Sequence, residues 1–278
     1  MDYSVPILSI VFMAVVAMLG IVIPVVLLLV FRKKYKTNIL AFFIGCAVFI
    51  VFALIIEAIL HRLILSSAIG LKIQGNIWLF AVYGGLMAGI FEETGRFTVF
   101  KTLLRKKSGN DGYALMYGAG HGGFEAFYLL TVSMISYISM AVMLNAGMSG
   151  TVTAGVTDEM ARKTLEATFT FLANTPPASF LMSIVERMAA VALHISLSVL
   201  VWFAAKDKGR FWLYPLAVIL HAVVDAAVII MARNGLNVWI IEAVLYVMTA
   251  CCIIVARIVW KKSVSEQVNH SIINEAGV

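Results

Sequence analysis

Acidic, histidine and arginine side chains recur inside the longest apolar stretches of this 278-residue sequence. A charge in a membrane-spanning helix costs about 2.5–3.5 kcal/mol on insertion scales, so such residues usually face a bundle interior and carry function. They fall into four groups along the chain: Glu92, Glu93 and Arg96; His121 and Glu125; Glu186, Arg187 and His194; His221 and Asp225.

The spacing of these residues predicts shared helix faces and a shared depth. Three pairs are four residues apart and therefore lie on one face of a helix: Glu92 and Arg96, His121 and Glu125, His221 and Asp225. One acid or histidine of each group lies roughly 14–18 Å from the helix end that borders a basic loop, at 1.5 Å per residue. Three histidines and several carboxylates at one depth can hold a metal, and imidazole and carboxylate are expected ligands of zinc. His61 and Glu57 are interpreted instead as a local pair one turn apart.

Glycines surround the second group. Gly118, Gly120, Gly122 and Gly123 lie in one short stretch and cost helix stability, which predicts close approach by another backbone or by a substrate. We expect the long helix that carries them to be kinked or broken there.

The elements that hold these groups are membrane helices. The chain is 62% apolar and 13% charged, with a mean hydropathy of +0.98, whereas soluble domains are about half apolar and a quarter charged. We predict an all-α, polytopic transmembrane helical bundle that forms one domain over residues 1–262, followed by a polar, loose cytoplasmic tail at 263–278. The expected spans, about seven in number, are 5–31, 38–60, 77–100, 112–145, 178–204, 211–232 and 236–260.

Basic loops set the expected orientation. Clusters of Lys and Arg follow the first, third, fifth and seventh spans, and alternate loops share one side of a membrane, which the positive-inside rule makes cytoplasmic. The sequence thus predicts a multi-pass protein of the cell membrane with its N-terminus outside. The net charge of +6 is explained by these basic clusters, which set the orientation in the membrane, and no nucleic-acid partner is expected. The long outer loop at 147–176 is either a solvated connector or, from Asp158, the start of an amphipathic helix.

The four groups, in this order, resemble those of the YhfC-type intramembrane metalloproteases, which look like a branch of the set that contains the type II CAAX prenyl endopeptidases and the PrsW proteases. Glu92-Glu93-x-x-Arg96 resembles the first motif of that set, with two residues between the acids and Arg96 where the CAAX enzymes have three. His194 fits the lone histidine, and His221-x-x-x-Asp225 fits the last motif.

The second motif departs from the pattern. In Gly120-His121-Gly122-Gly123-Phe124-Glu125 the phenylalanine directly precedes the glutamate, so either His121 or Glu125 can occupy the ligand position. The resemblance covers the region from the third to the sixth expected span.

The resemblance implies an intramembrane metal-dependent endopeptidase that cleaves a membrane-embedded or membrane-proximal peptide or protein, with membrane lipid around it. A divalent metal, expected to be zinc, would lower the pKa of its water toward about 7. His121, His194 and His221 would hold the metal, with Glu125 or Asp225 as a fourth ligand or supporting partner. Glu92, with Glu93 as an alternative, would take the water's proton. Arg96, Glu186 and Arg187 would support the site. In the CAAX branch, a water held by glutamate and histidine is the alternative scheme.

Two other classes of function stay open. Intramembrane acids and histidines also mark ion or metal transporters and proton relays, although the sequence lacks the internal repeat of many transporters. A non-proteolytic membrane scaffold is the third possibility.

Overall fold

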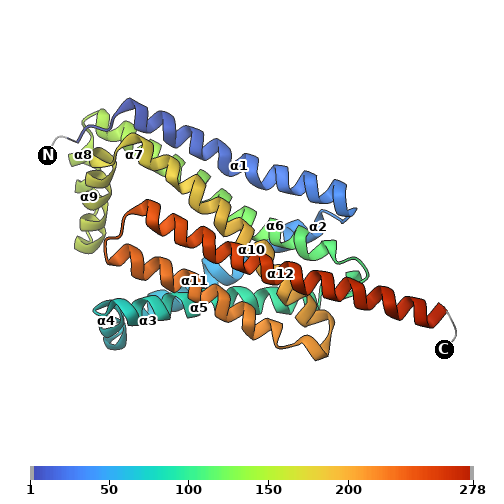
Figure 1. The fold of residues 1–278 in the computed structure, drawn as a ribbon. Coiled ribbons are helices and arrows are strands. Elements are labelled where there is room, and N and C mark those ends of the chain that lie inside the picture. Colours follow the sequence, from blue (N-terminus) through green and yellow to red (C-terminus); the bar gives the residue numbers. More distant parts are fainter. Residues whose placement is uncertain (1–2, 276–278) are drawn as a thin grey trace. The chain divides into compact units, whose positions relative to one another are not determined.

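The described part of the chain consists mostly of helices joined by short irregular segments. This computed structural model describes residues 3–275, and their side chains as far as Glu266. Every regular element in that range is a helix, which confirms the predicted all-α, polytopic bundle (Figure 1). The helices, in chain order, are α1 (Ile7–Tyr35), α2 (Leu40–Val48), η1 (Phe49–Glu57), α3 (Ala58–Leu65), α4 (Ala68–Gln74), α5 (Ile77–Lys101), η2 (Arg105–Lys107), α6 (Gly112–Ala126), η3 (Phe127–Val132), α7 (Ser133–Asn145), α8 (Ser149–Ala154), α9 (Glu159–Asn174), η4 (Pro177–Leu181), α10 (Met182–Lys206), η5 (Lys208–Arg210), α11 (Leu213–Arg233) and α12 (Val238–Glu275). Of these, η1 and η3 are π-helices, and η2, η4 and η5 are 3-10 helices.

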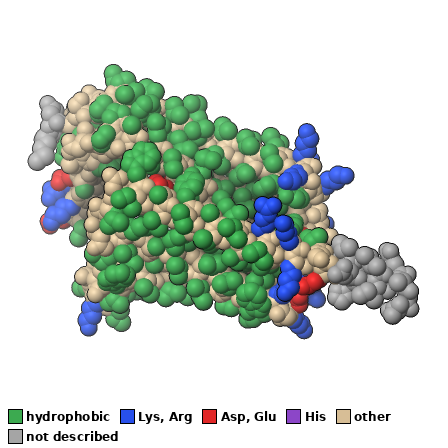
Figure 2. All heavy atoms as spheres, viewed as in Figure 1, with side chains coloured by type: hydrophobic (Ala, Val, Ile, Leu, Met, Phe, Trp, Pro, Cys, Tyr) green, Lys and Arg blue, Asp and Glu red, His purple; other side chains and the backbone are tan. Residues whose placement is uncertain are grey.

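Six helical segments of the described chain are long and apolar enough to cross a membrane, and they match six of the expected spans. The seventh, α5, qualifies together with α4, which meets it at a bend of 109°. The cap of α5 lies at this bend: Asn76 has extended backbone and accepts hydrogen bonds from the amides of Trp78 and Leu79. At the other end of α4, Ser67 accepts a hydrogen bond from the amide of Gly70 and starts that helix. Large apolar side chains cover much of the visible face in Figure 2, with Lys and Arg at its margins, as a lipid-facing surface requires.

The chain divides into two compact units. One combines the N-terminal segment as far as Val25 with Ala126–Met188, and the other combines Val26–Glu125 with the chain from Ala189 onward. Both units contain parts of candidate spanning helices, and the single domain over residues 1–262 stays a prediction. The second unit holds all the candidate site residues except Glu186 and Arg187.

The first unit is closed by polar contacts between distant segments. Asn145 exchanges two hydrogen bonds with the backbone of Val5, at 2.7 and 2.9 Å, and Thr131 donates to the carbonyl of Ala17 at 2.8 Å. These bonds satisfy backbone groups that lipid could not.

Within the second unit, α5 and α11 pack extensively against each other. Gly85 and Gly89 make this possible, because a Cβ on Gly85 would collide with the carbonyl of Ala222 and one on Gly89 would lie 2.7 Å from the carbonyl of Val218. Small residues four apart are the usual means by which membrane helices bring their backbones together. We call this contact the α5–α11 seam.

The glycines of α6 also allow close packing, as the sequence predicts. A Cβ on Gly120 would collide with the carbonyl of Phe42 on α2, and one on Gly118 would lie 2.8 Å from the Cα of Ile195 on α10. The expected kink at these glycines is wrong: α6 runs through them as a regular α-helix, and the irregular stretch is the π-helix η3 that follows it. Backbones on both sides hold α6 straight.

Three further segments differ from the sequence expectation or resolve it. Asp158 caps α9 by accepting a hydrogen bond from Ala161 at 2.7 Å, so the amphipathic-helix interpretation of this loop is confirmed. The short helix α4 was not predicted, because its seven residues are too few to show a clear period. α12 continues through Lys262 to Glu275, residues 276–278 of the expected tail lie outside the described residues, and the cytoplasmic tail at 263–278 stays a prediction.

Candidate metal centre

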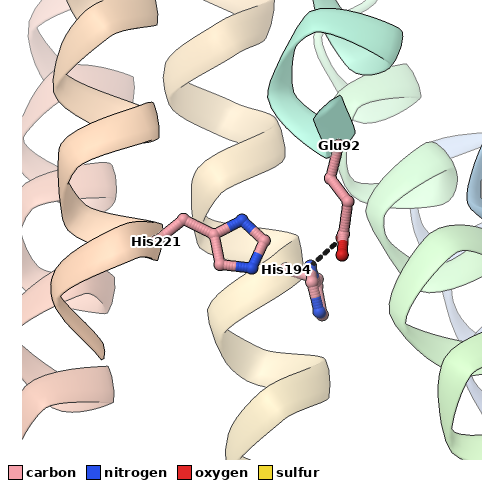
Figure 3. A group of neighbouring side chains, drawn as sticks. All are labelled: Glu92, His194 and His221. Atoms are coloured by element: carbon pink, nitrogen blue, oxygen red, sulfur yellow. Dashed lines mark ion pairs between the residues drawn. The ribbon is translucent and has the colours of Figure 1, made fainter. Parts of the chain in front are cut away.

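Three side chains from three helices of the second unit converge in its interior. Glu92 on α5, His194 on α10 and His221 on α11 each offer a ligand atom, and these atoms lie within 4.8 Å of one another (Figure 3). All three residues are buried. Buried carboxylates and imidazoles in a lipid-facing bundle are costly unless they pair with one another or bind an ion. We call these three residues the donor cluster.

His121 on α6 holds the carboxylate of Glu92. Its Nε2 lies 2.8 Å from Oε2 of Glu92, and the same oxygen lies 3.7 Å from Nδ1 of His194. The imidazole of His121 is fully buried, with the rings of Phe49 and Tyr117 5.4 and 6.0 Å away. Its Nδ1 has no hydrogen-bond partner among the described residues. His121 thus touches the cluster through Glu92.

Glu93 fixes the orientation of His221. Its Oε1 lies 2.9 Å from Nδ1 of His221, and its other oxygen pairs with the guanidinium of Arg96. Glu93 and Arg96 have no exposed side-chain surface. Asp225, one turn beyond His221, approaches Nε2 of that histidine at 3.5 Å and keeps 34% of its side chain exposed. Asp225 therefore has the most exposed side chain among the acids of this group.

Glu125 contacts His194 as Glu93 contacts His221. Its Oε2 lies 2.6 Å from Nε2 of His194, while Nη2 of Arg96 lies 3.3 Å from Nδ1 of the same ring. Each histidine of the cluster therefore has a carboxylate on one ring nitrogen and faces the cluster with the other. A carboxylate behind a histidine is the usual arrangement at protein metal sites, where it fixes the tautomer and raises the basicity of the ligand.

The donor cluster fits a divalent metal by its chemistry. Two imidazoles and a carboxylate are a common set of protein ligands for catalytic zinc, which keeps one further position for water. The expected convergence of Glu92, His121, His194 and His221 is observed, but the cluster contains Glu92, whereas the sequence-based hypothesis used His121 as a ligand. Which of these residues are ligands stays a prediction. The i, i+4 rule finds the faces of the helices, but it cannot find which nitrogen of a ring turns toward a neighbouring helix.

Two other pairs were expected from the sequence. Glu57 and His61 pair at 3.0 Å, and the ring of His61 also contacts the hydroxyl of Tyr83 at 2.8 Å. Glu186 and Arg187, expected to support the site, pair with each other at 2.5 Å in the first unit. Their supporting role stays a prediction.

Comparisons with known proteins agree with this architecture. Residues 19–245 match the family model described as YhfC intramembrane metalloprotease. The chain is also similar to the membrane protein YhfC of Bacillus subtilis (strain 168), with 32% identity over 229 residues, which cover 81% of this chain and 86% of that protein. No solved structure matches. The wider kinship with CAAX prenyl endopeptidases and PrsW proteases stays a prediction. On this match over most of its length, the chain is a multi-pass membrane protein that belongs to the YhfC intramembrane metalloprotease family.

Proposed function

We propose that this protein is an intramembrane metal-dependent endopeptidase that hydrolyses peptide bonds in or near the membrane. One observation carries the proposal: Glu92, His194 and His221 converge within 4.8 Å in the interior of a helical unit whose outer surface is apolar. The family match gives independent support and does not favour the ion or metal transporter.

His194 and His221 are the proposed metal ligands, and Asp225 completes the set because it lies 3.5 Å from Nε2 of His221. Zinc is the proposed metal, because imidazole and carboxylate ligands suit it. When bound, it would supply Lewis acidity that makes a water molecule a nucleophile near neutral pH. Glu93 and Glu125 hold the two rings from behind, and Arg96 compensates the charge of Glu93.

Glu92 is the proposed proton acceptor. His121 holds one of its oxygens at 2.8 Å, which fixes the carboxylate at the edge of the cluster where a water beside the histidines would lie. A glutamate so placed can take a proton from water and deliver it to the leaving amine. The alternative is that Glu92 is the third metal ligand, a place that its distance to both histidines also allows.

The test compares Glu92→Gln with the wild type for cleavage of a membrane-peptide library and for bound metal. Loss of a general base costs about 10²–10⁴ in rate, so cleavage should nearly disappear while the metal stays bound. Glu159→Gln is the matched control, because Glu159 is an exposed acid paired with Lys163 on the surface helix α9. Loss of the metal in Glu92→Gln would make Glu92 a ligand, and undiminished cleavage would reject its role as base.

The same preparations separate the peptidase from the transporter. Protein reconstituted in liposomes should cleave peptide and carry no ion flux that depends on Glu92. Flux without any cleavage would contradict the proposed function. The proposed substrate is a membrane-embedded or membrane-proximal peptide or protein, and the proposed location is the cell membrane, with the N-terminus outside and the C-terminus in the cytoplasm.

A further inference from the structure

A polar cavity lies in the same unit as the donor cluster, at the ends of α5 and α10. Its volume is about 370 Å³. Four cationic side chains from separate short stretches line it, together with the hydroxyl of Ser108: Lys101, Arg105, Lys206 and Lys208. Among the described residues, the lining contains no carboxylate. Cations gathered in a concave site focus their field and attract an anion more strongly than the same charges on a flat surface.

The floor of this cavity is apolar and fixed in place. The rings of Phe100 and Trp202 meet edge to face with their centroids 5.1 Å apart. The indole of Trp202 donates a hydrogen bond to Asp111 at 2.8 Å, and Lys206 donates to the same oxygen at 2.8 Å. Asp111 therefore balances one of the four cations and locks the wall of the cavity, which leaves a net positive site over an aromatic floor.

We propose that this cavity binds a phosphate group, and we place that group on the headgroup of an anionic membrane lipid. The cavity lies where two candidate membrane spans end, which is the depth of lipid headgroups. Leu103, next to the lining residues, exposes 66% of its surface and offers apolar contact for an acyl chain. Arg105 supplies the planar fork that suits phosphate oxygens, and the lysines add point charges.

Membrane topology alone does not explain this lining. The positive-inside rule requires cations somewhere in a loop, and it places no demand on which of them share a cavity. In the 3-10 helix η2, Arg105 lines the cavity, whereas its neighbours Lys106 and Lys107 are not part of the described lining. These two lysines are therefore a control with the same charge and nearly the same location.

The experiment uses the full chain and native mass spectrometry to count retained lipids, with phosphatidylglycerol and phosphatidylcholine as probes. Wild type should retain phosphatidylglycerol preferentially. Arg105→Gln with Lys208→Gln should weaken that retention about 10- to 30-fold, the order expected for two cations near a headgroup. Lys106→Gln with Lys107→Gln should leave it nearly unchanged. The swap Arg105→Lys with Lys208→Arg should also keep retention, which separates lost charge from misfolding.

The remaining outcomes decide against the site or identify its occupant. Equal losses in the two charge-neutralising double variants would mean diffuse surface attraction and would overturn the proposal. Equal retention of the two lipids by the wild type would overturn it as well. Displacement of phosphatidylglycerol by millimolar inorganic phosphate would support the phosphate site and assign it to a soluble phosphate source. This inference is independent of the proposed peptidase activity, because none of the mutated residues belongs to the donor cluster.

Discussion

Glu93 is a buried acid that the structure places between a cation and a ring. It touches Arg96 on one side and His221 on the other, and its side chain has no exposed surface. Replacing it by glutamine removes the charge that balances Arg96 and weakens the hold on His221. Removal of one partner of a buried ion pair costs about 3–5 kcal/mol. We therefore expect Glu93→Gln to be less stable than the wild type.

Glu93→Gln should also bind metal about 10–100-fold more weakly, the usual effect of losing the carboxylate behind a ligating histidine. The measurement is a metal titration of purified protein, with melting temperature followed in parallel. The double variant Glu93→Gln with Arg96→Met is the control: it removes the buried charge imbalance, so stability should partly return while metal affinity stays low. Metal affinity equal to that of the wild type in Glu93→Gln would contradict the positioning role.

His121 and His221 should respond differently to the same substitution. His121 contacts the cluster through Glu92, whereas His221 belongs to the cluster itself. His121→Ala should therefore lower cleavage and leave most of the metal in place, and His221→Ala should lose both. The measurement pairs elemental analysis of the purified variants with the cleavage assay. Metal lost equally from both variants would make His121 a ligand, as the sequence-based hypothesis has it.

At the scale of elements, two adjacent glycines of α5 give a matched test of the α5–α11 seam. A Cβ on Gly85 would collide with the carbonyl of Ala222, which is backbone and cannot move aside, whereas a Cβ on Gly84 would meet only the tip of the Ile229 side chain at 3.1 Å. Gly85→Ala should cost about 1–3 kcal/mol by overpacking and lower cleavage with it. Gly84→Ala should change neither, and thermal unfolding in detergent measures the difference. Equal melting temperatures would remove the seam as a constraint.

Long, apolar membrane-spanning helices are the part of this fold that the sequence predicts well. Runs such as 5–31 and 236–260 are apolar all round, so lipid is the one environment that suits them, and the structure has α1 and α12 there. The π-helices and the glycine contacts are less accessible. Four glycines in α6 predict that another backbone packs closely against this helix. Whether the helix bends there or a neighbouring helix packs against it depends on Phe42 and Ile195, which lie far away in sequence.

The candidate site divides in the same way. The residues of the donor cluster, Glu92, His194 and His221, could be predicted from sequence. An ionisable side chain in an apolar, membrane-spanning run is costly and usually has a function. The arrangement around them could not. That Glu125 on α6 contacts His194 on α10 follows from how these two helices pack, which no local spacing rule contains. The family resemblance identified the YhfC family correctly, but it left undecided which residues are the metal ligands.

At the scale of the whole molecule, the predicted orientation gives a labelling experiment. Gly109 and Gly209 lie in two of the basic loops, and Gly150 lies at the start of α8. The space where a side chain on Gly109 or Gly150 would project is open. In a cysteine-free background, cysteines at positions 109 and 209 should react with an impermeant reagent only from the cytoplasmic side, and a cysteine at 150 only from outside. The opposite pattern would invert the topology, and labelling of all three from one side would reject the expected number of spans.

The α5–α11 seam has a consequence for how a substrate enters. A peptide substrate of the proposed activity must reach a site that is buried among helices. The seam is an unsuitable entrance, because separating Gly85 from Ala222 would also pull Glu93 away from His221. We therefore expect the seam to stay closed during turnover and the peptide to arrive beside Asp225, which has the most exposed side chain among the acids around the donor cluster. Cysteines at positions 84 and 229, joined by a short cross-linker, would tie the two helices together. If the cross-linked protein still cleaves peptide, the two helices do not need to separate during turnover. If cleavage stops, the substrate enters between them.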